Sequence, residues 1–351
     1  MLSSHNDKIE LPAEWEVQSG ILLTWPHANS DWKDNLDEIG QVYLDMCKAI
    51  SQYEKLLIIC YDIQHKETIE ELFNNNAIPK EAYHLSICKT NDTWCRDYGP
   101  ITVRNDGTLQ INNFVFNSWG NKYNSELDNS VSMHLYKEGF FNSNEIINCN
   151  FILEGGSIES DGHGTLLTTS HCLLKRHPDK SKTEIEALLK KYLGANTVHW
   201  LDHGALSGDD TDSHIDNLAR FVNHDTIVYC TIHDEKHPDY DSLKQMESEL
   251  TKLKKDNGDS YKLIPITNPD NIKHNGKVLP ASYINFLIIN QAVLVPAYNV
   301  PQDHDALEIL QQCFPDRRII GIRSNALIKQ FGGLHCASMQ LPAGVLNPTI
   351  S

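Results

Sequence analysis

Short runs of β-branched and aromatic residues occur in pairs along the chain, and turn-forming residues separate the two members of each pair. Asn, Asp and Gly at such breaks accept the positive backbone φ that tight hairpins require. The pattern therefore predicts four β-hairpins, over residues 101–116, 151–174, 214–232 and 283–295. Two further strands are predicted over residues 20–25 and 56–61.

Between and before the hairpins, apolar residues recur at steps of three and four, the period of a helix with one buried face. Such stripes predict helices over residues 34–53, 182–193, 240–253 and 303–313. Five units of about 70 residues would each hold a hairpin, a helix and a further strand. Because no linker-like segment divides the series, residues 1–351 are predicted to form one α/β domain.

The charge balance narrows the class of ligand. The 351 residues carry 30 Lys and Arg against 47 Asp and Glu, a formal net charge of −17. Since no basic run is present, no nucleic-acid partner is expected, whereas a cationic small molecule suits the chain. No apolar run reaches the roughly 18 residues that a membrane span needs, so no membrane partner is expected.

Cysteine usage indicates the compartment. Nine cysteines are scattered without a C-x-x-C pair, and the first residues lack the basic and apolar segments of a secretory leader. We therefore expect a protein of a reducing compartment, the cytoplasm, in which most of the thiols are buried and inert.

Two patterns that could suggest a cofactor are incomplete. His233 and His237 have the spacing of a helical zinc motif, but Asp234 replaces the usual Glu and Pro238 follows directly, so a solvated loop is expected. The glycines around residues 155 and 163 complete neither a dinucleotide fingerprint nor a P-loop. No metal and no organic cofactor are therefore expected.

Two acidic motifs stand beside predicted strands. Asp97 lies in a segment with Trp94. Taken alone, it is expected to pair with its neighbour Arg96 or cap a turn, and ligand binding is the alternative. Glu154 ends an apolar run, and the glycines that follow it allow close approach of the backbone, although a turn role explains it equally well. Neither motif decides between structure and chemistry by itself.

A third motif covers residues 209–217. On a strand, His214 and Asp216 would point to one face while Ile215 points to the core. That arrangement places an acid–base imidazole beside a carboxylate. An exposed polar strand end with a satisfied histidine is the alternative interpretation.

Apart from Cys95, which is close to Trp94 and Asp97, the other cysteines lie in strand-like or helical stretches. Cys336 instead follows a Gly-Gly turn, Gly332-Gly333, from which a thiol can reach a cleft. A thiolate with a distant His and Asp is the usual sequence pattern of a cysteine nucleophile, since the partners meet only in the fold. A buried inert thiol remains the alternative.

Taken together, four ordered motifs resemble those of one family. They are W-x-R-D-x-G-P (94–100), E-G-G-S (154–157), D-T-x-x-H-x-D-N (210–217) and G-G-x-H-C (332–336), and they resemble the agmatine deiminase and bacterial peptidylarginine deiminase family of guanidine-modifying enzymes. The resemblance implies the pentein fold, a five-bladed pseudo-symmetric α/β propeller with a central active site. Five repeated units agree with that fold.

The resemblance also implies hydrolysis of a guanidinium group to a ureido group and ammonia. Agmatine, giving N-carbamoylputrescine for putrescine biosynthesis, is the expected substrate, and peptidyl or free arginine, giving citrulline, is the alternative. Cys336 is implied as the nucleophile that forms a covalent thiouronium, and His214 as the acid and base. Asp97 and Asp216 are implied to bind the guanidinium group, with Glu154 orienting His214.

Further expectations concern the rest of the substrate. Trp94 is expected to form an aromatic wall beside the cation, and Asp210 or Asp212 to hold the far ammonium group. A zinc hydrolase and a binder without turnover are the rival classes. The histidine spacings form no convincing ligand set, and every implied catalytic group is present, so both rivals are disfavoured. A homo-oligomer is compatible with the sequence.

Overall fold

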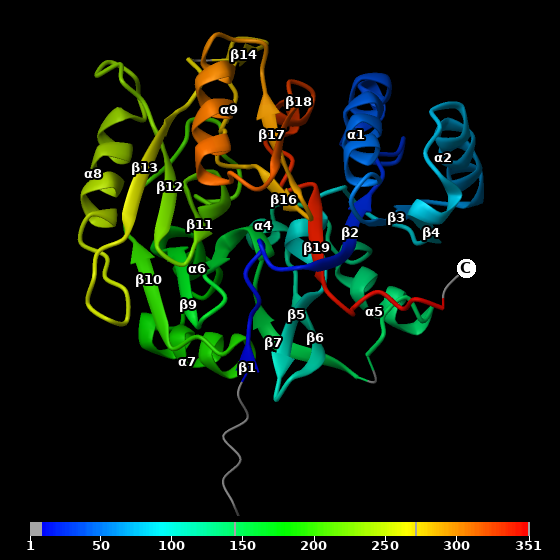
Figure 1. Cartoon of the computed structure of the whole chain (residues 1–351), viewed down its shortest axis with the longest axis horizontal. Helices are drawn as coiled ribbons and strands as arrows, with labels where there is room; N and C mark the ends of the chain where they lie inside the picture. The colour runs from blue at the N-terminus through cyan, green and yellow to red at the C-terminus, as the bar shows by residue number, and fades with distance from the viewer. Residues whose placement is uncertain (1–8, 144, 271, 350–351) are drawn as a thin grey trace, which may run out of the picture.

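The computed structural model of the chain describes residues 9–143, 145–270 and 272–349 (Figure 1). Its strands form five units with one plan, in which two antiparallel strands are followed by a third that runs parallel to the second. A parallel neighbour needs a long crossover connection, and in each unit this connection contains helix. The five units expected from the sequence are confirmed.

Four of the units follow one another along the chain, and each begins with a hairpin. Their strands are β5 (Ile101–Asn105), β6 (Thr108–Val115) and β7 (Ile146–Ile152); β8 (Ile158–Ser160), β9 (Thr165–Thr169) and β10 (Thr197–Leu201); β11 (Ala219–Asn223), β12 (Thr226–Thr231) and β13 (Lys262–Thr267); and β16 (Leu287–Ile289), β17 (Ala292–Ala297) and β18 (Arg318–Arg323).

The fifth unit is assembled from the two ends of the chain. β19 (Ser338–Pro342) pairs antiparallel with β2 (Gln18–Thr24), β2 pairs parallel with β3 (Lys55–Cys60), and β4 (Tyr83–Ile87) extends this sheet. Pairing of the last strand with one of the first closes the series of units, as a propeller requires. Three short strands, β1 (Ile9–Glu10), β14 (Lys273–His274) and β15 (Lys277–Val278), lie outside the common plan.

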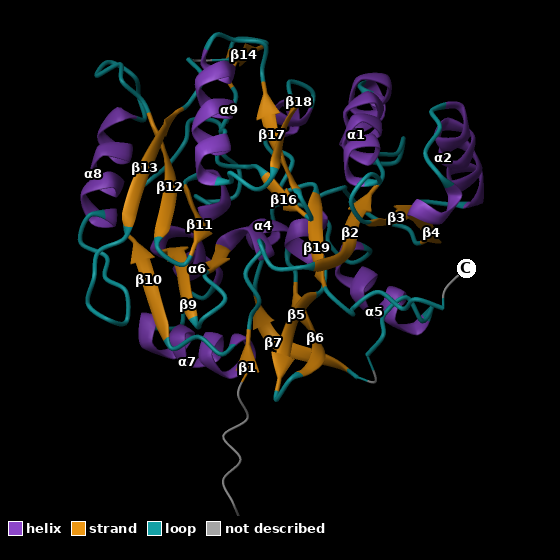
Figure 2. Cartoon of the chain, viewed as in Figure 1, coloured by secondary structure: helices purple, strands orange, loops and turns teal. Residues whose placement is uncertain are grey.

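The longer crossover helices lie around the rim of the molecule, with the strands between them and the centre (Figure 1, Figure 2). The four predicted stripes are confirmed as α1 (Leu36–Ile50), α7 (Lys182–Leu193), α8 (Tyr240–Leu250) and α9 (Gln302–Cys313). α7 has the predicted bounds because Ser181 and Glu184 form a capping box at its start and Gly194 ends it in the left-handed conformation.

Other helices carry a weaker sequence pattern and were not predicted. They are α2 (Ile63–Asn75), α3 (Cys95–Tyr98), α4 (Ser118–Asn121), α5 (Val131–Lys137) and α6 (Ser170–Arg176). Short 3₁₀ helices complete the connections: η1 (Asp31–Asp34), η2 (Lys80–Ala82), η3 (Asp128–Ser130), η4 (Gly155–Ser157), η5 (Ile215–Asn217) and η6 (Leu327–Gln330).

The predicted hairpins have the right turns but not always the right ends. The second was predicted over residues 151–174, yet Phe151 belongs to β7 of the preceding unit and Ser170 begins α6, leaving the hairpin between β8 and β9. The third was predicted to start at residue 214, but η5 precedes β11. A hydrophobic run alone does not show where one unit ends and the next begins.

Apolar residues fill two cores between the sheets and their helices. Several polar residues are also buried, near the centre of the five units, where apolar residues would be more usual. Asp97, Glu154, His214 and Asp216 are each no more than 4 % exposed. Because buried ionisable groups are costly unless they are paired, their clustering marks a candidate functional site.

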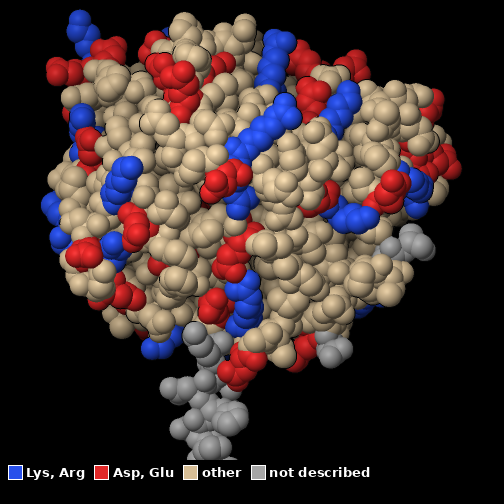
Figure 3. All heavy atoms as spheres, in the orientation of Figure 1, with Lys and Arg blue, Asp and Glu red and all other residues tan. Residues whose placement is uncertain are grey.

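Surface features add little to this picture. No helix in the described ranges is both long and apolar enough to cross a bilayer. On the face shown in Figure 3, basic and acidic side chains are interspersed, so the acidic excess does not mark a binding surface there.

Candidate active site

Cys336 lies in the tight loop between η6 and β19. A Cβ atom at Gly332 would come within 2.2 Å of the Trp94 ring, and one at Gly333 within 2.4 Å of Asn285 Oδ1. Neither of these glycines has a positive φ, whereas Phe331 before them has a φ of 69°. The two glycines therefore serve close packing between two side chains, and the loop brings the thiol to the lining of a pocket.

Asp97 is held in α3 by two donors. Trp119 Nε1 donates to Asp97 Oδ2 at 2.9 Å, and the Gly156 backbone N–H donates to Asp97 Oδ1 at 3.0 Å. Arg96 instead donates to the backbone carbonyl of His335 at 3.2 Å. The predicted pairing of Asp97 with Arg96 is therefore not formed, and Asp97 lines the same pocket as Cys336.

His214 precedes η5 instead of lying on a strand, so the predicted alternation is wrong. Asp209 accepts hydrogen bonds from the backbone N–H groups of Thr211 at 3.1 Å and Ser213 at 2.7 Å. Ser213 also has a φ of 67°, which turns the chain out of the extended conformation. This side-chain capping, more than strand propensity, decides the local structure.

The turn nevertheless brings the motifs together at Gly156. A Cβ atom there would lie 2.7 Å from His214 Nδ1, 2.9 Å from Asp97 Oδ1 and 3.0 Å from Asp216 Oδ2. Any side chain at Gly156 would therefore intrude among the three groups. The E-G-G-S motif contributes this space as well as a carboxylate.

The imidazole of His214 lies between two carboxylates. Its Nε2 is 3.5 Å from Glu154 Oε2, and its Nδ1 is 3.7 Å from Asp97 Oδ1. Burial disfavours the charged ring, but Asp97, Cys172 and Glu154 outweigh burial and raise the pKa of His214 well above its usual value. The ring is therefore protonated at neutral pH and can act as an acid.

Glu154, Cys172 and His214 also form the one group of three potential metal ligands found among the described residues, with ligand atoms within 4.8 Å of one another. Arg176 Nε already lies 2.6 Å from Glu154 Oε1. Burial and the Glu154 charge raise the pKa of Cys172 to about 11, whereas a metal site needs a deprotonated thiol. The group is thus better suited to holding protons than to binding a metal ion.

Asp216 is fixed by a second buried histidine. His335 Nδ1 lies 2.9 Å from Asp216 Oδ2, and His335 Nε2 lies 2.7 Å from Glu14 Oε2. Arg220 connects Glu14, at 2.7 Å, to Glu159, at 3.0 Å. Burial raises the pKa of Asp216, but its bond to His335 and the positive charges nearby prevail and lower it. Asp216 is therefore an ionised carboxylate.

The Cys336 thiol faces both an amide and a carboxylate. Its Sγ lies 3.1 Å from Asn285 Nδ2 and 3.5 Å from Asp216 Oδ2. Burial, together with Asp216 and Asp97, raises the pKa of Cys336 well above that of an ordinary thiol. A cation between these carboxylates would remove the repulsion and favour the thiolate.

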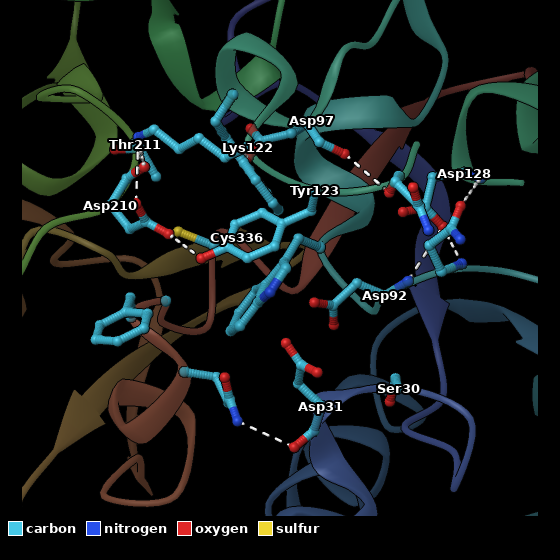
Figure 4. Close-up of a pocket in the computed structure, with 18 of the residues that line it drawn as sticks. Ser30, Asp31, Asp92, Asp97, Lys122, Tyr123, Asp128, Asp210, Thr211 and Cys336 are labelled. Carbon is cyan, nitrogen blue, oxygen red and sulfur yellow. Dashed lines mark hydrogen bonds and ion pairs between the residues drawn. The ribbon is translucent and has the colours of Figure 1, made fainter. Parts of the chain in front are cut away.

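Of these groups, Asp97 and Cys336 line a pocket of about 760 Å³. Buried Trp94 lines it and packs against Trp32, with ring centroids 5.7 Å apart. In Figure 4 the Asp31 and Asp92 carboxylates point toward one another across open space. The predicted ammonium ligand Asp210 also lines the pocket, but it already accepts a hydrogen bond from Tyr123 at 2.7 Å and pairs with Lys122 at 3.2 Å.

The structure thus brings together Cys336, His214, Asp97, Asp216 and Glu154, as the motifs predicted. Sequence reasoning assigned no role to Glu14, Asn285 or Arg176, which hold those groups. The available signal was a single polar residue within an apolar run, as for Asn285 in Y-I-N-F. What such a residue contacts is decided by distant segments.

Two other sequence features have no place in the site. Cys95 donates to the carbonyls of Leu22 and Ala337 at 3.3 and 3.2 Å, and burial raises its pKa to about 12, so it is an inert thiol. His233 and His237 lie in loop and turn before α8, which confirms the predicted loop.

Comparison with known proteins gives the family. Residues 10–342 match the family described as Porphyromonas-type peptidyl-arginine deiminase. A curated Lactococcus lactis protein named "Putative agmatine deiminase" is 31% identical, with 96% of each chain covered.

Solved structures agree with this match. A C. jejuni agmatine deiminase with substrate bound is 37% identical, with a TM-score of 0.90 over 98% of this chain and 99% of that one. The "Putative Arginine Deiminase from Porphyromonas gingivalis" is 41% identical, with a TM-score of 0.90 over 97% and 100% of the two chains. The five units are therefore the blades of a pentein fold, and the chain belongs to the Porphyromonas-type peptidyl-arginine deiminase family.

Proposed function

We propose that the protein is a cysteine-dependent guanidine deiminase that converts agmatine and water to N-carbamoylputrescine and ammonia. One observation carries the proposal: a thiol, an imidazole and three carboxylates converge in one buried site around Gly156. A guanidinium ion is planar, charged and rich in N–H donors, so it suits such a site.

Asp97 and Asp216 are proposed to receive the guanidinium N–H groups. Burial, Asp216 and Glu154 raise the pKa of Asp97, although His214 opposes them, so these carboxylates repel one another. A bound cation would relieve that repulsion and allow Cys336 to ionise. Trp94 would cover the cation with its ring.

In the first half of the reaction, the Cys336 thiolate attacks the central guanidinium carbon and a C–S bond forms. Protonated His214 donates its proton to the departing amino group, the C–N bond breaks and ammonia leaves. The product is a positively charged thiouronium on Cys336 and a neutral His214. Glu154 keeps the imidazole in place through its 3.5 Å contact.

In the second half, neutral His214 takes a proton from water, whose oxygen attacks the same carbon. The C–S bond breaks, its electron pair returns to Cys336 as thiolate, and the ureido product loses its extra proton. That proton balances the one carried away when ammonia becomes ammonium. The sum is one guanidinium and one water giving one urea derivative and one ammonium ion.

The far end of the pocket supports a substrate that ends in an ammonium group. Asp31 and Asp92 face each other there, and burial together with Asp31 raises the pKa of Asp92 to about 6. Asp210 is already paired with Lys122. We therefore propose that Asp31 and Asp92, and not Asp210, bind the ammonium group. A substrate with a carboxylate at this end would be repelled by them.

We also propose that residues 1–351 form one catalytic domain and act in the cytoplasm. Pairing of β19 with β2 ties both ends of the chain into one sheet, which supports a single domain. All nine cysteines lie in described segments and are free, as is usual for proteins of reducing compartments. The product would then be available to a reaction that removes its carbamoyl group.

The decisive experiment gives the purified protein agmatine, free arginine and a peptide with a C-terminal arginine, and measures ammonia and the ureido product. Agmatine should react fastest, and Cys336→Ala should release no measurable ammonia. Full activity of that variant would exclude the mechanism. Faster formation of citrulline from either arginine substrate would select the alternative function.

A second assay tests the ammonium site. Asp31→Asn should raise the KM for agmatine about ten-fold, the equivalent of roughly 1.4 kcal/mol. The KM for butylguanidine, which has no ammonium group, should stay unchanged. Asp210→Asn is the matched control, and a larger effect in that variant would assign the ammonium group to Asp210.

A further inference from the structure

Asn285 is a buried polar residue in an apolar segment. Tyr283, Ile284 and Phe286 around it are fully buried, and Asn285 itself is 1 % exposed. A buried amide must find hydrogen-bond partners within the protein. Those of Asn285 come from two sequence-distant parts of the site, the Cys336 loop and the carbonyl of Asp216.

The hydrogen bonds fix which end of the amide faces the thiol. Oδ1 accepts from the backbone N–H groups of His335 at 3.0 Å and Cys336 at 3.2 Å. A flipped amide would place its NH₂ group against these two donors, so the observed orientation is the one the network allows. Nδ2 therefore donates, to Cys336 Sγ at 3.1 Å and to the carbonyl of Asp216 at 3.4 Å.

The donor lies where the thiolate most needs one. The Asp216 carboxylate is 3.5 Å from Cys336 Sγ and disfavours negative charge on sulfur. Among the described side chains, Asn285 is the donor to that sulfur atom, and Gly333 packs directly against its amide oxygen. Such a donor is already in place before charge develops, which is the condition for electrostatic stabilisation without rearrangement.

We propose that Asn285 is a further catalytic residue, whose side-chain N–H stabilises the Cys336 thiolate and whose oxygen holds the nucleophile loop. This role rests on the proposed deiminase function, in which Asn285 acts twice. It stabilises the thiolate that attacks the guanidinium carbon, and it stabilises the same thiolate when the C–S bond breaks and sulfur takes the electron pair. Neither step requires a co-reactant other than water.

Asn285→Asp separates this role from that of a structural clamp. The substituted side chain keeps the shape and the oxygen that accepts the two backbone N–H groups, but it replaces the donor to sulfur with an oxygen. Asn290→Asp is the matched control, because Asn290 also bonds backbone through both ends of its amide, to Gln18, in the turn between β16 and β17.

The first measurement is alkylation of Cys336 by iodoacetamide in the ligand-free protein, followed by mass spectrometry of its peptide across pH. Asn285→Asp should shift the alkylation profile to higher pH and slow alkylation at pH 8 at least about 10- to 100-fold, because the hydrogen bond to the charged sulfur is lost and a repelling carboxylate takes its place. Asn290→Asp should alkylate as the unchanged protein does. An unshifted profile in Asn285→Asp would overturn the proposal.

The second measurement is turnover of agmatine, where kcat should fall by a similar factor in Asn285→Asp while KM changes little. Asn285→Ser is measured in parallel, since its side chain is neutral and too short to reach both the loop and the sulfur. An upward shift in this variant too would come from loss of the donor and not from the new charge of Asn285→Asp, and no shift in Asn285→Ser would overturn the proposal. Alkylation does not depend on turnover, so a protein that releases no ammonia from agmatine, free arginine or the arginine peptide refutes the deiminase function and still tests the Asn285 contact.

Discussion

Two buried histidines each lie between two carboxylates, but with different spacing. The ring nitrogens of His335 are 2.9 and 2.7 Å from Asp216 and Glu14, which are hydrogen-bond distances. Those of His214 are 3.7 and 3.5 Å from Asp97 and Glu154. A ring that is bonded at both nitrogens is fixed, whereas one with looser contacts can give and take a proton as charges change.

The surroundings of the two rings strengthen the contrast. Glu14, behind His335, is also bound to Arg220, and that arginine is bound to Glu159, so the ring is anchored to a buried chain of bonded side chains. His214 instead adjoins Gly156, whose missing side chain leaves space beside the ring nitrogen. His335 thus supports Asp216, whereas His214, also flanked by two carboxylates, is the proposed proton carrier.

The largest expected effect is on activity at the loosely held histidine. His214→Gln should lower kcat by about 10²- to 10⁴-fold, the usual contribution of a general acid and base. Because its contacts are long, the protein should remain folded at the assay temperature. Initial rates with agmatine, together with circular dichroism, check both points, and a variant that retains most of its kcat would reverse the assignment.

His335→Gln should act mainly on stability. The change leaves at least one of two buried carboxylates, Asp216 or Glu14, without its imidazole partner, and removing a partner from a buried charge costs about 3 to 5 kcal/mol, so the free energy of unfolding should fall by roughly that amount. Because Asp216 loses its support, the KM for agmatine should rise, with a smaller loss of kcat than in His214→Gln. Denaturant unfolding and steady-state kinetics test this, and a kcat loss equal to that of His214→Gln would remove the distinction.

The pH dependence sharpens the contrast further. The pKa of folded His214 is raised above the unfolded value of about 6.5. The folded state therefore binds this proton more tightly, and the resulting stability is full below about pH 6.5 and is lost as pH rises through the folded pKa. The difference in unfolding free energy between the unchanged protein and His214→Gln should be larger at pH 6 than at pH 9. A difference that grows with pH would contradict the charged state assigned to His214.

The smallest effect is expected at a surface pair. His304 and Glu308 on α9 lie 3.3 Å apart, but their side chains are 76 % and 63 % exposed. His304→Ala should change the free energy of unfolding by less than about 1 kcal/mol, because solvent screens exposed pairs. Denaturant unfolding of His304→Ala and His335→Gln under the same conditions provides the comparison. An equal loss of unfolding free energy in both variants would show that burial does not cause the difference between the two histidines.

Local sequence was sufficient where local chemistry decides structure. Ser181, Glu184 and Gly194 fix the ends of α7 within a few residues, and the polar turns fix the hairpins. It was insufficient for residues 214–217, because Asp209 caps a turn where alternation predicted a strand. It also did not show that the fifth blade joins β19 to β2, which are separated by most of the chain.

The same division applies to the site. The four motifs predicted Cys336, His214, Asp97, Asp216 and Glu154 as the site, because residue types and their order carry that prediction. The sequence by itself also determined the five repeated units and the acidic character of the chain. Only the tertiary structure decided that Asn285 contacts the thiol and that His335 is tightly held while His214 is not. These depend on distances of a few ångströms between distant segments, which packing sets and local sequence does not.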